Sequence, residues 1–293
     1  MTRSLKVGCV QHCAGTNTDR NLRQLEKLIT KVAAQDAEII CLSEYATTYG
    51  ASRGRLQVGA EYEDSHVGLA AIRDLARQTG RWILIGSIAI KRDDDLISNR
   101  SYLIDNAGAI VASYDKIHLF DVDLDRGESY RESAMIKAGD KAVLVDTPFG
   151  RFGLTICYDL RFPQLYRTLA KAGAEVIFAP AAFTRTTGRD HWHTLVTARA
   201  IETGAYLLAP CQCGDVKGKL ARYGHSLIVS PWGGILADGG ENAGIITADL
   251  DLDKVALARQ RIPALSHDRL FEISFAPKSE GGEEQTSSHP NAS

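Results

Sequence analysis

Three side chains that together could carry out acyl transfer lie at or just after the ends of strand-like segments. They are Cys157, Glu44 and Lys116, and the segments are residues 152–157, 38–42 and 109–114. Alone, such a cysteine is usually a small buried hydrophobic residue, and a glutamate or lysine there is usually a solvated cap. Together they supply a nucleophile, a proton acceptor and a positive charge for a developing oxyanion. The set therefore favours acyl transfer at a thiol.

The residues around Cys157 predict how its thiol would be presented. A helix-like stretch follows the strand almost at once, and this geometry projects a side chain at the carboxyl edge of a sheet, where α/β proteins place ligands. Amide dipoles at the start of a helix can lower the pKa of a thiol from its ordinary value of about 8.5. Arg161 lies about one helical turn further on, where it could bind a substrate carboxylate or form a structural salt bridge.

Strand-like runs alternate with helical patterns, which predicts an α/β layered fold. Further strands are expected at residues 5–10, 82–90, 101–104, 175–179 and 205–209, and helices at 17–35, 67–78, 163–172, 190–203 and 252–260. Residues 106–108 are expected to form a hairpin turn leading into the strand before Lys116. Residues 226–229, 231–234 and 245–250 are expected to form a closing hairpin. Hairpins among the helices favour mixed sheets over a purely parallel barrel.

Composition narrows the class of protein. With 293 residues, 44% hydrophobic and 24% charged, the chain can bury a large core without disulfides. A net charge of −2 gives no electrostatic reason to expect a nucleic acid or an anionic membrane as partner. The apolar runs are too short to cross a bilayer, and the start of the sequence lacks the apolar segment of a signal peptide. The six cysteines lie in strand-like segments, so we expect a reduced, cytoplasmic protein.

The motifs around the three side chains resemble those of the nitrilase superfamily of carbon–nitrogen hydrolases. Glu44, residues 116–119 (KIHL) and residues 153–163 (GLTICYDLRFP) occur in the order typical of that family. The resemblance covers about residues 5–275. It implies a four-layer α-β-β-α sandwich with mixed sheets, usually paired into homodimers or larger homo-oligomers. It also identifies Glu132 as the family's fourth residue, which orients the lysine and assists the water step.

The domain boundaries follow from the same resemblance and from composition. Residues 1–276 are expected to form one carbon–nitrogen hydrolase domain. Residues 277–293 are polar, without aromatic or β-branched aliphatic residues, so they are expected to be disordered or held by a partner chain.

Residues 182–202 and 224–233 resemble the amidase branch of the family, which includes deaminated-glutathione amidase and omega-amidase. This implies a small-molecule amide as substrate. The candidate substrate contacts are Phe183, Thr184, His191 and Trp192. Ser43 and Gln164 depart from residues that family members often carry, which puts the substrate in doubt more than the chemistry.

The residue types then predict a mechanism. Glu44 accepts the thiol proton, and Cys157 attacks the amide carbonyl to give a thioester. Lys116 and the backbone N–H of Tyr158 hold the oxyanion. An N-carbamoyl amino acid hydrolase or a nitrilase would use the same residues, so both remain alternative enzymes. The non-enzymatic alternative is a catalytically silent binding or assembly protein on this scaffold.

No metal or other cofactor is expected in this chemistry. Cys211 and Cys213 lack partners at zinc-ligand spacing, and His191 and His193 lack the i, i+4 spacing of a helical zinc pair. The glycine pairs at residues 233–234 and 239–240 are not set in a strand–loop–helix phosphate motif and are interpreted as turns.

Overall fold

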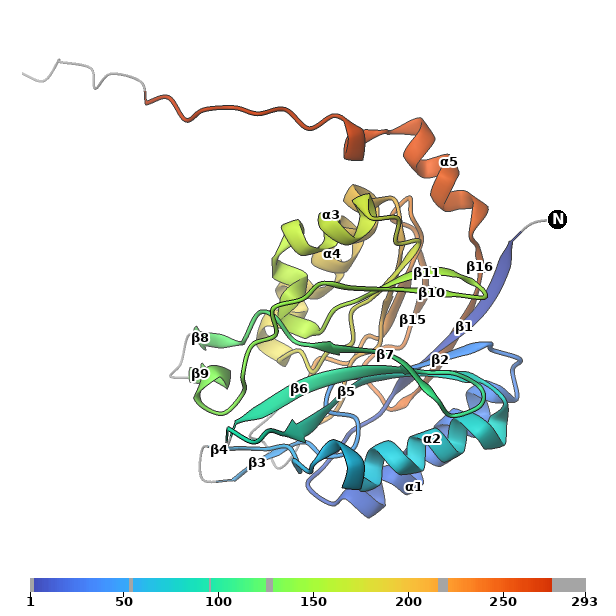
Figure 1. Cartoon of the computed structure of the whole chain (residues 1–293), viewed down its shortest axis with the longest axis vertical. Coiled ribbons are helices and arrows are strands. Elements are labelled where there is room, and N and C mark those ends of the chain that lie inside the picture. Colours follow the sequence, from blue (N-terminus) through green and yellow to red (C-terminus); the bar gives the residue numbers. More distant parts are fainter. Residues whose placement is uncertain (1–2, 53–54, 95, 125–128, 216–220, 276–293) are drawn as a thin grey trace, which may run out of the picture.

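Two mixed six-stranded β-sheets face each other, and helices cover their outer faces (Figure 1). The computed structural model describes residues 3–52, 55–94, 96–124, 129–215 and 221–275. The predicted α-β-β-α sandwich is therefore confirmed. The tail predicted at residues 277–293 lies outside the described residues, so the predicted domain boundary stays a prediction.

The first sheet has the order β16-β1-β2-β5-β6-β7. Its strands are β1 (Ser4–Gln11), β2 (Ile39–Leu42), β5 (Trp82–Lys91), β6 (Ile97–Ile104), β7 (Ile110–Asp115) and β16 (Gly244–Asp251). The central pairs β1–β2 and β2–β5 are parallel, and the outer pairs are antiparallel. Helices α1 (Thr18–Ala33) and α2 (Val67–Thr79) cover its outer face (Figure 1). Asn17 caps α1 by accepting a bond from the N–H of Arg20.

The second sheet has the order β10-β11-β12-β13-β14-β15. Its strands are β10 (Val143–Thr147), β11 (Gly150–Leu154), β12 (Val176–Phe178), β13 (Tyr206–Ala209), β14 (Leu227–Val229) and β15 (Ile235–Asp238). Helices α3 (Pro163–Lys171) and α4 (Arg185–Thr203) pack on this half, and α5 (Asp253–Arg261) follows β16. Two small hairpins, β3 (Gly50–Ser52) with β4 (Arg55–Gln57) and β8 (Asp121–Asp123) with β9 (Ser129–Arg131), lie outside the sheets. Among the described helices, none has the length and apolar character needed to cross a membrane.

The closing hairpin is the main error of the sequence-based prediction. β14 turns at residues 231–234 as expected, but it pairs with β15, and β16 pairs with β1 in the other sheet. β15 was not predicted because it is a short, largely exposed edge strand without a clear alternation of apolar residues. The error matters for the fold because β16 is the segment that returns the chain to the first sheet.

Two further elements begin earlier than the sequence pattern indicated. β6 begins at Ile97 and includes the polar residues Ser98 and Asn99, both fully buried. α4 begins at Arg185, because the Thr184 hydroxyl accepts a bond from the N–H of Thr187 and caps the helix. The hairpin turn at residues 106–108 is confirmed, with Gly108 at φ 76° between β6 and β7.

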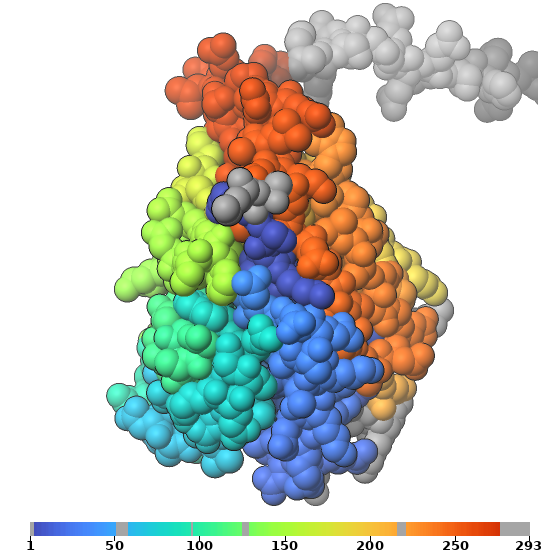
Figure 2. All heavy atoms as spheres, turned by 90° about the vertical axis from the view of Figure 1, so that its right-hand side faces the viewer, coloured from blue at the N-terminus to red at the C-terminus, as the bar shows by residue number. Residues whose placement is uncertain are grey.

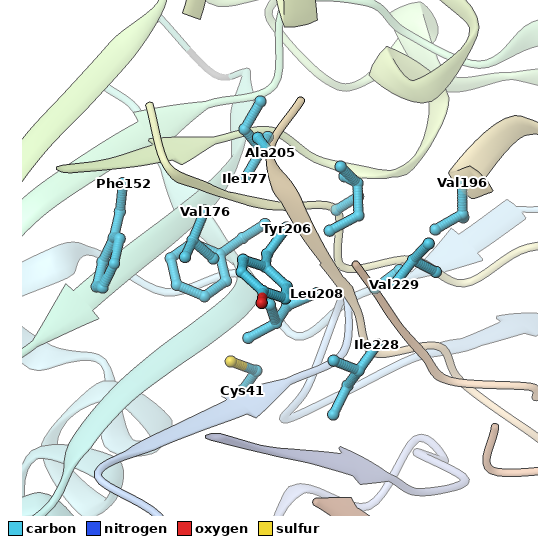
Figure 3. Close-up of a cluster of buried hydrophobic side chains, with 14 of the residues drawn as sticks. Cys41, Phe152, Val176, Ile177, Val196, Ala205, Tyr206, Leu208, Ile228 and Val229 are labelled. Atoms are coloured by element: carbon cyan, nitrogen blue, oxygen red, sulfur yellow. The ribbon is translucent and has the colours of Figure 1, made fainter. Parts of the chain in front are cut away.

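The alternation of side chains along β2 divides the hydrophobic core in two. Ile39 and Cys41 point into the core that includes both sheets, whereas Ile40 and Leu42 point toward α1 and α2. Figure 3 shows Cys41 in the same cluster as Val176 and Tyr206 of the second sheet. Burial on both faces explains why β2 is a continuous apolar run in the sequence. It also fixes the register of the strand that leads to Glu44, because a slip of one residue would exchange its two faces.

Candidate active site

A buried cluster of charged side chains forms where the loops after β2 and β7 meet. The Lys116 ammonium lies 3.0 Å from Glu44 Oε1 and 2.9 Å from Glu132 Oε2. The exposed fractions of Glu44, Lys116 and Glu132 are 2%, 2% and 8%. Charges at such depth are costly unless they are paired, and here one cation faces two carboxylates. The structure thus brings three of the four predicted catalytic residues into direct contact.

The surrounding polar groups distinguish the two carboxylates. Glu132 accepts bonds from Lys116, the Tyr45 hydroxyl, the Asn99 amide and the N–H of Phe120. Glu44 Oε1 accepts from Lys116 and Asn99, whereas its Oε2 accepts from the N–H of Ala182 in the other half of the molecule. A carboxylate offers about four lone-pair positions. Glu132 is therefore filled, and Glu44 Oε2 has room for a further donor.

The charges in this cluster hold one another in their ionised forms. Burial would lower the pKa of Lys116, but the carboxylates of Glu132 and Glu44 raise it well above its ordinary value. Burial would raise the pKa of Glu132, but the Lys116 charge and the donors around the carboxylate lower it. Lys116 therefore remains an ammonium and Glu132 a carboxylate at neutral pH.

Cys157 reaches this cluster from the second sheet. After β11 ends at Leu154, a 3-10 helix over Cys157–Arg161 begins with the cysteine itself. Its φ is 48°, in the left-handed region that non-glycine residues rarely adopt, and its N–H donates to Pro180 O at 2.8 Å. Such strain concentrates at functional sites because the surrounding structure must hold it. The predicted strand–cysteine–helix geometry is thus present, with a 3-10 helix before α3.

The pKa of Cys157 shifts in the opposite direction to the one that the helix start indicated. Burial and the charge of Glu44 raise the pKa of this thiol well above its ordinary value. The Lys116 ammonium and a hydrogen bond from the N–H of Ala182 act in the opposite direction but do not outweigh them. The prediction of a lowered pKa was wrong, because it considered the helix start and not the depth of the thiol. At neutral pH the resting group is therefore a thiol.

Asp159, two residues after Cys157, was not singled out from the sequence. Its side chain is fully buried and accepts bonds from the Tyr114 hydroxyl (2.6 Å), the N–H of Ile156 (2.8 Å) and both the N–H and the ring of His118. It therefore fixes the turn that carries Cys157 to the loop that carries Lys116. The available signal was an aspartate among apolar residues, which is costly to bury without partners.

Asn99 and Gly86 were also missed. Asn99 donates to both Glu44 and Glu132, and it lies in the polar part of β6 that was not predicted as strand. A Cβ at Gly86 would lie 2.1 Å from Leu42 O and 2.6 Å from Pro180 Cβ. Only glycine therefore allows β5 to approach the chain just before Glu44 and the loop beside Cys157.

The other predicted site residues fall into two groups. Tyr158 follows Cys157 in the first turn of the 3-10 helix, where an N–H has no acceptor within the helix. The Arg161 guanidinium lies 5.4 Å from the centre of the Phe183 ring and 3.3 Å from His191 Nδ1, so these three residues adjoin one another.

Thr184 and Trp192 have structural contacts instead. Thr184 caps α4, and Trp192 is fully buried against Phe183, with its indole N–H bonded to His225 O. Their predicted contact with substrate stays a prediction.

The arrangement can carry out nucleophilic attack on a carbonyl carbon. It offers a thiol, a carboxylate that can take the thiol proton, and an ammonium beside the place where an oxyanion would form. Among the described residues, His193, His225 and Asp238 form a group that could hold a metal ion. None of the four predicted catalytic residues belongs to that group.

Comparison with known proteins gives consistent results. The family model for carbon–nitrogen hydrolase matches residues 6–260. The deaminated glutathione amidase of Dictyostelium discoideum is 37% identical over 278 residues, covering 92% of this chain and 96% of the relative. That of Synechocystis sp. is 38% identical, covering 90% and 98%. The crystal structure of the C. elegans NitFhit protein superposes with a TM-score of 0.82 and 32% identity, covering 92% of this chain and 66% of that one.

Proposed function

The chain belongs to the carbon–nitrogen hydrolase family and is an amidase, and we propose that it cleaves its substrate through a thioester on Cys157. The observation that carries this proposal is the buried contact of Lys116 with Glu44, whose charge acts on the buried thiol of Cys157. These three side chains come from three separate parts of the chain. Glu44 and Lys116 would each be costly to bury alone.

The first half of the reaction forms the thioester. Because the resting group is a thiol, its proton passes to Glu44 as the sulfur attacks the amide carbonyl. The carbonyl oxygen becomes an oxyanion held by the Lys116 ammonium and the N–H of Tyr158, and one such donor is worth about 3 kcal/mol. Glu44 then gives its proton to the departing nitrogen. The C–N bond breaks, and ammonia or an amine leaves.

The second half restores the thiol. Water gives a proton to Glu44 and attacks the thioester carbonyl, the C–S bond breaks, and the proton returns from Glu44 to sulfur as the acid is released. Glu132 does not carry this proton, because its oxygens are already filled by donors. We assign it the role of orienting Lys116.

The substrate class follows from the relatives and from the surroundings of Cys157. Relatives that span nearly the whole chain are named deaminated glutathione amidase, so a deaminated-glutathione-like amide or another small ω-amide is the proposed substrate. Arg161, which adjoins Phe183 and His191, is the residue that we propose to bind a carboxylate of such a molecule.

A panel of amides, ureides and nitriles tests the proposal, with ammonia, amine and acid products quantified. We expect the wild type to turn over amides and the Cys157→Ala variant to be inactive, while Cys9→Ala, which alters a buried cysteine of β1, keeps its turnover. Chelation with EDTA should leave the activity unchanged. Activity without Cys157 would exclude the mechanism. A preference for ureides would favour an N-carbamoyl amino acid hydrolase, and a preference for nitriles would favour a nitrilase. If no compound were turned over, a binding or assembly protein would be favoured.

We also propose that the chain forms a homodimer. Exposed apolar side chains surround the β14–β15 turn and α5, with exposed fractions of 57% for Trp232, 55% for Ile201, 43% for Leu257 and 59% for Ile262. Figure 2 shows the C-terminal part of the chain, in orange-red, as a projection at one end of the molecule. A second copy covering this surface would remove it from water. Sedimentation should show a dimer or larger species, and a monomer at micromolar concentration would contradict the proposal.

For location, we propose the cytoplasm. All six cysteines are free, including Cys9 and Cys41 on adjacent strands of the first sheet, which suits a reducing compartment. Cell fractionation with an antibody to the chain should recover it in the cytoplasmic fraction, and recovery from an oxidising compartment would refute the proposal.

A further inference from the structure

Two histidines and an aspartate from three separate elements converge outside the buried charged cluster. His193 lies on α4, His225 just before β14, and Asp238 at the end of β15. Asp238 Oδ2 is 3.0 Å from His193 Nε2 and 3.1 Å from His225 Nδ1, and all the potential ligand atoms lie within 4.8 Å of one another. Two neutral imidazoles and a carboxylate oxygen are a common ligand set for zinc.

The backbone of His225 is held in position by several contacts. Its φ is 52°, its N–H donates to Gly240 O at 2.6 Å, and its carbonyl accepts from the Trp192 indole at 2.7 Å. The Tyr223 ring stacks on its imidazole, with the ring centres 4.5 Å apart. A strained residue held from several sides is pre-organised, so little ordering would remain when an ion binds.

The other two residues also have supporting partners. Asp238 Oδ1 accepts from the N–H of Gly240 at 2.8 Å and also lies 2.9 Å from His225 Nδ1, while Oδ2 contacts both histidines. The Tyr223 hydroxyl lies 3.4 Å from the second ring nitrogen of His193. Partners of this kind, on the atoms that do not bind the ion, orient ligands in metal sites.

The distances suit a small divalent ion. Ligands about 2.0–2.1 Å from a tetrahedral zinc ion are roughly 3.3 Å apart. The two contacts to Oδ2, at 3.0 and 3.1 Å, are a few tenths of an ångström shorter. The side chains of His193, His225 and Asp238 are 33%, 20% and 34% exposed, so an ion can enter from solvent and water can occupy the fourth position.

We propose that His193 Nε2, His225 Nδ1 and Asp238 Oδ2 bind a divalent transition-metal ion, with zinc as the natural probe. The ion would link α4 to the β14–β15 hairpin and stabilise the second half of the sandwich. It takes no part in amide cleavage, because the proposed chemistry uses only Glu44, Lys116 and Cys157. The expectation of no metal compared two histidines along one helix, whereas these three ligands come from α4, from the segment before β14 and from the end of β15.

The experiment compares zinc binding by the full-length chain and two variants. After removal of bound metal, each protein is dialysed against zinc, and bound zinc is measured by elemental analysis. Because free cysteines also bind zinc, the quantity compared is the difference between proteins. We expect the wild type to bind one more zinc per chain than His193→Gln and Asp238→Asn. His267→Gln, which alters an exposed histidine after α5, should match the wild type.

Thermal unfolding provides the second measurement. Zinc should raise the Tm of the wild type and of His267→Gln, because an ion that binds only the folded chain stabilises it. It should not raise the Tm of the two site variants, whose circular dichroism without zinc should match the wild type. Equal zinc content in the wild type and both variants, or an equal shift of Tm, would overturn the proposal.

Discussion

The two halves of the sandwich contribute different chemistry to one site. The first half of the chain supplies Glu44, Lys116 and Glu132, three charged groups that satisfy one another through direct contacts. The second half supplies the neutral thiol of Cys157 and backbone N–H groups such as that of Ala182. The charged part is therefore largely complete without the second sheet, whereas the nucleophile acquires its base only when the two sheets are packed together.

A few hydrogen bonds join these two halves at the site. Ala182 and Gln212 of the second half donate to the side chain and the carbonyl of Glu44. In return, Asp159 accepts from Tyr114 and His118 of the first half. Variants in each half and in these links should therefore have distinguishable effects.

The largest effect is expected from Lys116→Met, which disrupts the charged half. It removes an oxyanion donor and leaves two buried carboxylates without their cation. We expect turnover to fall about 1,000-fold or more and stability to fall by about 3–5 kcal/mol. Steady-state kinetics and urea unfolding measure the two effects. The exposed Lys137→Met variant is the control, and near-normal turnover of Lys116→Met would contradict the assigned role.

A smaller effect is expected from Asp159→Asn, which alters the link between the halves. The amide group would place donors opposite the donors that now bind the carboxylate, so we expect a loss of about 3 kcal/mol in stability. Displacement of Cys157 should lower kcat by roughly 10- to 100-fold, with a smaller change in KM. Tyr114→Phe, which removes one of the donors, should be milder in both measurements. If it were as damaging as Asp159→Asn, the carboxylate would not be the organising group.

The smallest effect is expected from His12, a buried residue next to the segment that carries Glu44. It is buried beside Ser43, and burial lowers its pKa to about 4. Since the unfolded chain has an ordinary histidine pKa near 6.5, it takes up the proton first as the pH falls. The stability contributed by neutral His12 is complete above pH 6.5 and is lost as the pH falls toward 4, with about 2 kcal/mol lost between pH 7 and 5.

Urea unfolding at pH 7 and pH 5 tests this pH dependence. His12→Gln should lose less stability than the wild type over that interval, because glutamine does not take up a proton. Both proteins carry the same carboxylates, so their titration affects both equally. The difference between the two losses of unfolding free energy is therefore the contribution of His12. An equal loss in the wild type and the variant would refute the assignment.

The sequence predicted the positions of the reacting groups better than their environment. Glu44, Lys116 and Cys157 could be found because each follows an apolar strand, and the ends of such strands meet at one edge of the fold. The depth of the thiol could not be found in this way. The burial of the thiol depends on loops such as residues 180–182. These residues contact Cys157 in the fold but lie far from it in the sequence.

The missed residues share a physical cause. Asn99 and Asp159 are buried polar side chains, and most of their partners lie tens of residues away in the sequence. Periodicity identifies which face of an element is apolar, but it does not identify the donor that satisfies a buried acceptor. β14 and β16 were assigned to one hairpin for a related reason, since local alternation does not specify the sheet that a strand joins.

The left-handed backbone of Cys157 has a consequence for attempts to improve this protein. Glycine adopts φ near 48° without strain, so selection for thermal stability alone would favour Cys157→Gly. A library screened only for resistance to heat would thus drift toward folded, inactive proteins. Screens need to retain a measure of turnover in order to keep the residues that the fold holds under strain.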